Sequence, residues 1–201
     1  SSANNKLAHE MASVITNDRW GKETRGKHGG YYTTEYDLVH EGIFMDQGYA
    51  HPWEECRGIA GSFGYNRMEI LEDYSTSAEL VHILINKVAR GGNLLWNIGP
   101  TADGRIPVIM QQRLSDMGKW LEINGEGIYG TRRWEKAPKI TSETTVYYTK
   151  KGKDLYVICT QFPTQPLVID NIKNPSNVTM LGLKSPVKST FKNGKLTITP
   201  P

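Results

Sequence analysis

The sequence predicts an α/β fold in which part of a TIM-like (β/α) barrel precedes a small antiparallel β domain. Two segments with helical spacing flank an apolar strand at 93–98, and this strand ends in a polar loop at 101–104. Beyond Trp134 the pattern changes to short strands separated by Pro, Asn and Gly. Because (β/α) barrels carry their chemistry where strands end, the loops after strands are the places to search for a site.

Composition excludes several classes of function. The chain has 201 residues, of which 38% are hydrophobic and 22% charged, as in a globular protein with one or two cores. Its formal net charge of +3 includes no basic run, so we expect no nucleic-acid partner. No apolar run approaches the ~20 residues of a membrane span, so we expect no membrane partner. Cys56 and Cys159 fit neither a zinc spacing nor a disulfide framework.

The N-terminal elements are predicted as a helix, a strand and a long loop. Apolar residues with helical spacing predict a short helix at 4–12, and a β-branched strand at 14–16 follows it. This strand ends in the polar run 17–21. Residues 21–52 have no clear period but are rich in glycine and aromatic residues, which is typical of a functional loop. A further short strand is predicted at 61–65.

Two helices and the buried strand come next. Hydroxyl residues at 75–77 precede a helical apolar pattern that ends at 90–92, and the strand at 93–98 follows directly. Pro107 opens a second amphipathic helix, which ends at Asn124. The order strand, helix, strand, helix implies parallel strands joined by right-handed crossovers.

The C-terminal part is predicted to be a separate antiparallel β domain. Strands at 145–149 and 155–159 flank a charged turn and indicate a hairpin. Further short strands and a turn are expected at 167–169, 178–181, 193–194 and 196–198. We place the boundary near 135–139, which assigns 1–134 to the barrel and 135–201 to the β domain.

Six motifs now carry a family resemblance. They are NDRWG at 17–21, HGGYYTTEY at 28–36, WE at 53–54, SFGYN at 62–66, GGNLLWNIGP at 91–100 and NGEGIYG at 124–130. In this order they resemble the α-L-fucosidases of glycoside hydrolase family 29. The resemblance covers nearly the whole chain and is loosest in the β domain. It implies the C-terminal half of a barrel-like catalytic domain followed by a β-sandwich that is itself incomplete.

The resemblance implies exo-acting, retaining hydrolysis of terminal α-L-fucose from fucosylated glycans. This reaction needs a carboxylate nucleophile and a carboxylic acid about 5–5.5 Å apart, and it needs no metal or other cofactor. In the family the nucleophile is an aspartate after a tryptophan at an earlier strand end, and no such motif precedes the helix at 4–12. We therefore expect the nucleophile to lie in a missing N-terminal half of the barrel, and this fragment alone to be inactive. The resemblance also implies an extracellular, periplasmic or lysosomal location.

Two glutamates are candidates for the general acid/base. Glu35 matches the bacterial pattern of the family, and its aromatic loop would favour the protonated form that an acid needs. Glu54 is the rival position in animal-type relatives, and Asp37 is a third. Composition alone would make Glu35 an ordinary surface carboxylate.

Four further residues are candidate substrate contacts. Arg19 matches a family residue that binds the sugar hydroxyls near the nucleophile, although it could instead form a structural ion pair with Asp18. Phe63 matches an aromatic residue that packs on the C5 methyl of fucose, with core packing as the alternative. His28 could hydrogen-bond the sugar and Trp53 could stack on it, although single residues of these types are more often structural.

Other classes of function remain open on the residues alone. The chain could be a non-catalytic module that binds fucose or another carbohydrate, or a structural module, because it carries sugar contacts without a nucleophile. The β domain could also bind carbohydrate independently. Half of a barrel would expose unpaired strand edges, so we expect this segment to need a partner chain or segment.

Overall fold

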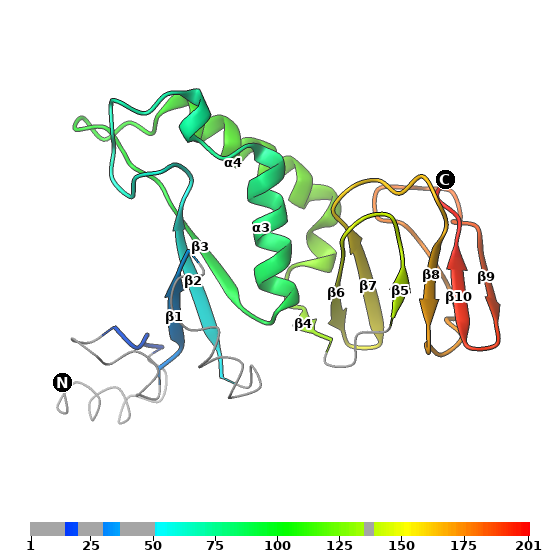
Figure 1. The fold of residues 1–201 in the computed structure, drawn as a ribbon. Coiled ribbons are helices and arrows are strands. Elements are labelled where there is room, and N and C mark those ends of the chain that lie inside the picture. Colours follow the sequence, from blue (N-terminus) through cyan, green and yellow to red (C-terminus); the bar gives the residue numbers. More distant parts are fainter. Residues whose placement is uncertain (1–14, 20–29, 37–50, 135–138) are drawn as a thin grey trace. The chain divides into compact units, whose positions relative to one another are not determined.

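The computed structural model describes residues 15–19, 30–36, 51–134 and 139–201. The chain forms two compact units (Figure 1). The first comprises Ser1–Leu80 and Arg90–Arg113, and the second comprises Val81–Ala89 and Leu114–Pro201. Helices α3 (Ser77–Ala89) and α4 (Val108–Asn124) each contribute residues to both units.

A three-stranded parallel sheet organises the first unit. Its strands are β1 (Tyr32–Glu35), β2 (Trp53–Gly58) and β3 (Asn93–Asn97), in the order β1-β2-β3 (Figure 1). Both pairings are parallel, as the order of strands and helices predicts. An isolated parallel bridge between Asn17 and Tyr31 brings the polar run 17–19 alongside the start of β1.

Two of these strands were not predicted. The sequence indicates a loop over 21–52 and a strand only at 61–65, whereas the structure has β1 and β2 and no strand at 61–65. β1 reads YTTE and β2 reads WEECRG, so neither shows a run of alternating apolar residues. Tyr, Thr and Trp do favour strands, but without an apolar alternation they do not mark where a strand begins and ends. Pairing between β1, β2 and β3 sets these bounds.

The helices begin where the sequence predicts. Thr76 Oγ1 accepts a hydrogen bond from the backbone N–H of Glu79 at 3.2 Å, and Glu79 Oε2 accepts one from the N–H of Thr76 at 2.7 Å. This reciprocal pair is a capping box that starts α3. α4 begins directly after Pro107, whose carbonyl accepts the N–H of Gln111 at 3.0 Å. A proline at this point costs the helix nothing, since the first N–H groups have no partner within it.

The core of the first unit centres on Trp53. This side chain is 2% exposed, and Ile59, Leu80 and Met110 are as fully buried. Gly92, between α3 and β3, packs directly on the indole ring, because a Cβ atom there would lie 2.5 Å from it. Only glycine allows this close approach. A short 3-10 helix, η1 (Leu71–Asp73), leads from the β2 loop towards α3.

The second unit contains two antiparallel sheets (Figure 1). One has the order β4-β6-β7, and the other has the order β5-β8-β10-β9. Their bounds are Arg132–Arg133 (β4), Ile140–Thr141 (β5), Val146–Lys151 (β6), Asp154–Cys159 (β7), Leu167–Asp170 (β8), Ser189–Lys192 (β9) and Lys195–Ile198 (β10). The predicted hairpin is β6–β7, and the predicted strands at 167–169 and 196–198 are β8 and β10.

One strand of this unit was predicted in the wrong place. The segment 178–181 forms no strand, and β9 pairs with β10 instead. The turn between β9 and β10 is Asn193-Gly194, where both residues have positive φ angles of 51° and 74°. These angles are those of a tight hairpin turn, for which Asn-Gly is the preferred pair. The turn was therefore predicted correctly, but the strand that it joins to β10 was not.

A buried hydroxyl connects β6 to the short 3-10 helix η2 (Gly125–Gly127). Thr149 is 0% exposed, and its Oγ1 donates a hydrogen bond to the carbonyl of Gly127 at 2.6 Å. Ile169 and Leu196, in the other sheet, are also buried. Among the described residues, no helix is both long and apolar enough to cross a membrane.

We predict that Thr149→Val destabilises the protein by about 1–3 kcal/mol, because the Gly127 carbonyl would stay buried without its donor. Valine matches threonine in shape, so the loss would report the hydrogen bond. The measurement is urea unfolding followed by circular dichroism. Thr190→Val, on the exposed face of β9, is the matched control and should change stability little. Equal losses in both variants would contradict the prediction.

Candidate active site

The register of β1 on β2 brings the two candidate glutamates to one face of the sheet. Thr33 pairs with Glu54, and Glu35 pairs with Cys56. Since side chains alternate along a strand and parallel neighbours in register point the same way, these four side chains share a face. Trp53 and Glu55 occupy the opposite face, where both are buried.

Arg19 is held against this face by two partners on β1. Its Nη2 forms an ion pair with Oε1 of Glu35, and its Nε donates a hydrogen bond to Thr33 Oγ1 at 2.8 Å. The side chains of Arg19 and Glu35 are each about one-third exposed, at 32% and 33%. A guanidinium held at two points is oriented as well as charged. The ion pair that the structure gives Arg19 is with Glu35, rather than the alternative with Asp18.

The buried carboxylate of Asp18 holds Thr33, the residue that binds Arg19. Asp18 is 1% exposed, and its Oδ1 accepts the Thr33 hydroxyl at 2.7 Å and the Thr33 backbone N–H at 3.1 Å. Because the Thr33 hydroxyl donates its proton to Asp18, its lone pairs remain available to accept from Arg19. Asp18, Thr33, Arg19 and Glu35 therefore form one connected polar chain.

The carboxyl group of Glu54 has a raised pKa. Burial raises the pKa of Glu54 above its ordinary value, and the nearby Arg19 guanidinium acts in the opposite direction. The pKa of the Cys56 thiol is also raised, chiefly by burial, with further contributions from the carboxylates of Glu35, Glu54 and Glu55. The thiol is therefore protonated near neutral pH and is a poor nucleophile.

The loop after β2 places Phe63 near the end of β1. Phe63 is 40% exposed, and its ring meets the ring of Tyr36 edge to face, with centroids 5.7 Å apart. Asn97, the last residue of β3, donates a side-chain hydrogen bond from Nδ2 to the carbonyl of Phe63. Phe63 is thus contacted through its ring by the residue after β1 and through its carbonyl by the last residue of β3.

The structure does not bring all of the predicted site residues together. Arg19, Glu35 and Glu54 lie on or next to the shared face, and Phe63 contacts Tyr36, the residue after Glu35. His28 lies outside the described residues. Trp53 is 2% exposed on the opposite face and packs on Gly92, so a stacking role for it finds no support in the geometry.

Three residues of the site were missed at the sequence level. Asp18 and Thr33 orient Arg19, and Tyr36 contacts Phe63. The spacing of Thr33 and Glu35 by two residues is the signal that could have paired them on one face, but only once β1 is known to be a strand.

The described residues offer neither a metal site nor a second reactive site in the polar loop at 101–104. Among the described residues, no group of three His, Cys, Asp or Glu side chains could hold a metal ion. In the loop at 101–104, Asp103 pairs with Arg105 at 2.6 Å, and the hydroxyl of Thr101 is the main cause of the lowered pKa of Asp103. The loop thus satisfies its own polar groups.

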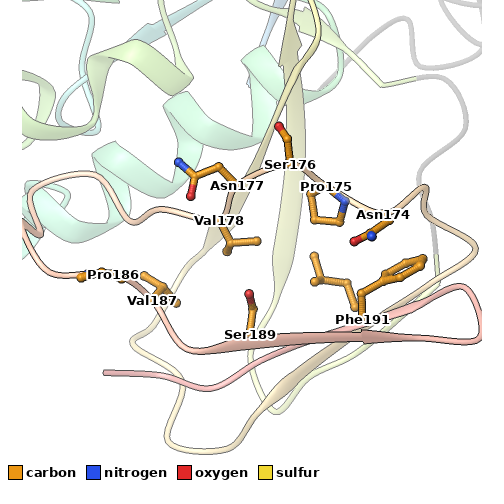
Figure 2. Close-up of a pocket in the computed structure, with 10 residues that line it drawn as sticks. Asn174, Pro175, Ser176, Asn177, Val178, Pro186, Val187, Ser189 and Phe191 are labelled. Carbon is orange, nitrogen blue, oxygen red and sulfur yellow. The ribbon is translucent and has the colours of Figure 1, made fainter.

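A hollow of about 260 Å³ lies in the second unit (Figure 2). It is bounded by the loop 174–178 on one side and by Val187, Ser189 and Phe191 on the other. Its lining includes no acidic, basic or thiol side chain, so it offers no group for acid–base chemistry and no base to activate its serine hydroxyls. The polar face of β1 and β2 therefore remains the candidate active site.

Known proteins similar to this chain are alpha-L-fucosidases. The sequence profile of the family described as "Alpha-L-fucosidase" matches residues 2–126. An alpha-L-fucosidase of Branchiostoma floridae is 42% identical over 186 residues, which cover 90% of this chain and 40% of that protein. The human plasma alpha-L-fucosidase is 44% identical over 155 residues, covering 76% of this chain and 32% of that protein.

Solved structures give the same result for the fold. Thermotoga maritima alpha-fucosidase in complex with fucose is similar with a TM-score of 0.77 and 32% identity, over 98% of this chain and 43% of that chain. Alpha-L-fucosidase isoenzyme 1 from Paenibacillus thiaminolyticus has a TM-score of 0.78 and 25% identity, over 98% and 49% of the two chains. This chain spans less than half the length of these relatives. On the match of profile, sequences and structures, the chain belongs to the α-L-fucosidase family.

Proposed function

We propose that this chain forms the C-terminal part of an exo-acting, retaining α-L-fucosidase, which removes terminal α-L-fucose from fucosylated glycans. The observation that supports this proposal most is the Arg19–Glu35 ion pair, which lies on the same sheet face as Glu54. This face therefore carries an oriented cation and two carboxyl groups, which suit sugar binding and proton transfer. The names of the relatives support fucose as the sugar.

In this proposal β1, β2 and β3 are three strands of a (β/α) barrel completed by residues outside this chain. Among the described residues, β1 and β3 are the edge strands of their sheet, and such edges invite further strands. The barrel would include 1–134, and the antiparallel strands of 135–201 would form a β-sandwich. The fold of the Thermotoga maritima relative supports this arrangement over nearly the whole chain.

The reaction would be a double displacement. An aspartate outside this chain attacks the anomeric carbon and forms a covalent bond to it, while the glycosidic bond breaks and Glu35 donates a proton to the departing oxygen. Glu35, now ionised, then removes a proton from water, which attacks the same carbon, breaks its bond to the aspartate and releases fucose. Two carboxyl groups suffice for both steps, and the proposal includes no metal or other cofactor.

Arg19 would bind the sugar hydroxyls. Its guanidinium is oriented for this role, because Nη2 pairs with Glu35 and Nε donates a hydrogen bond to Thr33 Oγ1 at 2.8 Å. The same ion pair would keep the Glu35 carboxyl next to the bound sugar.

Glu54 is the second candidate for the acid. Its raised pKa is the property that a general acid needs, and it lies beside Thr33 on the same face. The family pattern and the direct contact with Arg19 favour Glu35. Phe63 would contact the C5 methyl of the sugar, and His28 remains a candidate hydrogen-bonding residue. The plasma location in the names of relatives supports an extracellular, periplasmic or lysosomal site of action.

A non-catalytic carbohydrate-binding or structural module is the alternative function. Among the described residues, the polar face carries Glu35 and Glu54, which are both candidates for the acid, and no further carboxylate that could be the nucleophile. This favours the alternative. The two functions differ in one measurement, the release of 4-nitrophenol from an aryl α-L-fucoside. The proposed enzyme predicts release by the full-length polypeptide and none by residues 1–201 alone. Turnover by residues 1–201 alone would contradict the external nucleophile.

We predict that Glu35→Gln lowers kcat by about 10²- to 10⁴-fold on a fucosylated glycan, the range of a lost general acid. The variant should recover turnover of an aryl α-L-fucoside when azide is added, because azide needs no general base to attack the intermediate. The product would be α-fucosyl azide, which NMR identifies. Glu72→Gln, on the exposed 3-10 helix η1, is the control and should retain activity. Azide rescue of Glu54→Gln instead would assign the acid to Glu54.

The opposite pKa shifts of two glutamates predict opposite pH dependences of stability. Burial raises the pKa of Glu54 in the folded protein. Glu54 therefore contributes to the free energy of unfolding below its ordinary pKa of 4.5, where its carboxyl is neutral, and this contribution is lost as the pH rises. Glu54→Gln stays neutral, so its stability relative to the parent protein should increase as the pH rises above 4.5.

Glu143 provides the comparison of opposite sign. The backbone N–H groups of Thr164 and Gln165 lower the pKa of Glu143, so its stabilising effect is present above the ordinary value of 4.5 and is lost as the pH falls. Glu143→Gln should therefore be least stable, relative to the parent protein, at neutral pH. Thermal unfolding of both variants across the acidic range measures the two slopes. Slopes of the same sign would refute the assignment.

A further inference from the structure

Tyr36 lies between the proposed acid and the proposed contact for the sugar methyl. It follows Glu35 directly, at the end of β1, and its ring meets Phe63 edge to face with an interplanar angle of 76°. Its φ angle is 48°, in the left-handed region that costs an aromatic residue conformational energy. Surrounding contacts must hold it there.

The first of these contacts is made by the phenol oxygen. The backbone N–H of Gly58, at the end of β2, donates a hydrogen bond to Tyr36 Oη at 2.9 Å. A Cβ atom on residue 58 would itself lie 2.9 Å from this oxygen, so glycine is needed for the phenol to fit. The hydroxyl of Tyr36 is thus tied to the neighbouring strand.

The second contact is made by the face of the ring. The guanidinium carbon of Arg57 lies 5.2 Å from the centroid of the Tyr36 ring, within the range of a cation–π interaction. Nε of Arg57 is 2.8 Å from Oε1 of Glu55, which is fully buried. A rigid acidic group therefore holds the cation that packs on Tyr36.

The third contact of Tyr36 is the edge-to-face contact of its ring with Phe63. Phe63 is also restrained through its carbonyl, which accepts a hydrogen bond from Asn97. The backbone of Phe63 is thus tied to β3, and its ring contacts Tyr36 edge to face. Because Tyr36 is covalently next to Glu35, the same residue relates the ring of Phe63 to the carboxyl of Glu35.

We propose that Tyr36 is a positioning residue, tethered through its hydroxyl to Gly58, that fixes the ring of Phe63 relative to Glu35 and thereby sets the preference for a C5 methyl over a C5 hydroxymethyl group on the sugar. This inference rests on the proposed fucosidase function. An apolar wall favours the methyl sugar only while it stays in contact with it, and a ring free to swing would make room for an added hydroxyl. The tether therefore acts on selectivity rather than on the chemistry itself.

The test compares two substrates on one enzyme. kcat/KM is measured for 4-nitrophenyl α-L-fucoside and for 4-nitrophenyl α-L-galactoside, which differ only at C6, using the full-length polypeptide. The ratio of the two constants does not depend on the fraction of active enzyme, so a loss of stability alone would leave it unchanged. One small group in a pocket is worth roughly 10- to 200-fold in such a ratio.

Tyr36→Phe removes the tether and keeps the ring. We expect the ratio to fall by about three- to tenfold, a part of the range that one pocket contact provides. Tyr147→Phe is the matched control, because it also loses one hydroxyl hydrogen bond, from Asn86 Nδ2 at 3.2 Å, but in the second unit. Its ratio should equal that of the parent enzyme. If Tyr36→Phe does not fold, Tyr36→Asn replaces it, because asparagine tolerates the left-handed backbone, and the expected fall is at least as large.

A double-mutant cycle tests whether Tyr36 acts through Phe63. Phe63→Leu should lower the ratio by itself, and adding Tyr36→Phe should lower it no further. Independent, multiplicative effects would overturn the inference, and so would an unchanged ratio in Tyr36→Phe with an active parent enzyme. A parent enzyme that cleaves neither substrate would instead refute the proposed function, and the inference with it.

Discussion

The register of β1 on β2 is the constraint on which the site depends. It sets Thr33 beside Glu54 and Glu35 beside Cys56, so that one face of a parallel sheet carries both candidate acids. A shift of β2 by one residue would turn Glu54 to the other face and bring Glu55 in its place. The structure resists this shift, because Trp53 and Glu55 are both buried on the opposite face.

A buried carboxylate then orients the charges on that face. Asp18 is almost fully buried, a position that costs free energy unless its oxygens are bonded, and Thr33 supplies two of those bonds. The same threonine accepts a bond from Arg19, which pairs with Glu35. The polar run at 17–19 and the strand β1 are thus joined by side chains as well as by the bridge between Asn17 and Tyr31. A cation held at two points in this way keeps one orientation.

Under the proposed function, membership of the α-L-fucosidase family indicates the sugar, and the polar face of the first unit supplies side chains that could bind it. The second unit provides antiparallel sheets whose hollow has no acid–base group in its lining. The charged groups of the proposed site therefore lie in the first unit, on or next to β1 and β2.

The sequence by itself determined the elements that depend on local signals. The capping residues around Thr76, the position of β3 and the Asn193-Gly194 turn were all predicted, because caps, periodicity and turn chemistry act over a few residues. The expected burial of β3 was wrong, since none of its residues is buried and Leu95 is 43% exposed. Motifs also singled out Arg19, Glu35 and Phe63. Only the tertiary structure decided β1, β2 and β9, and with them the hydrogen-bond partners of Thr33 and Tyr36. Those strands lack a clear alternation of apolar residues, and the partners of a side chain depend on pairing between segments far apart in the chain.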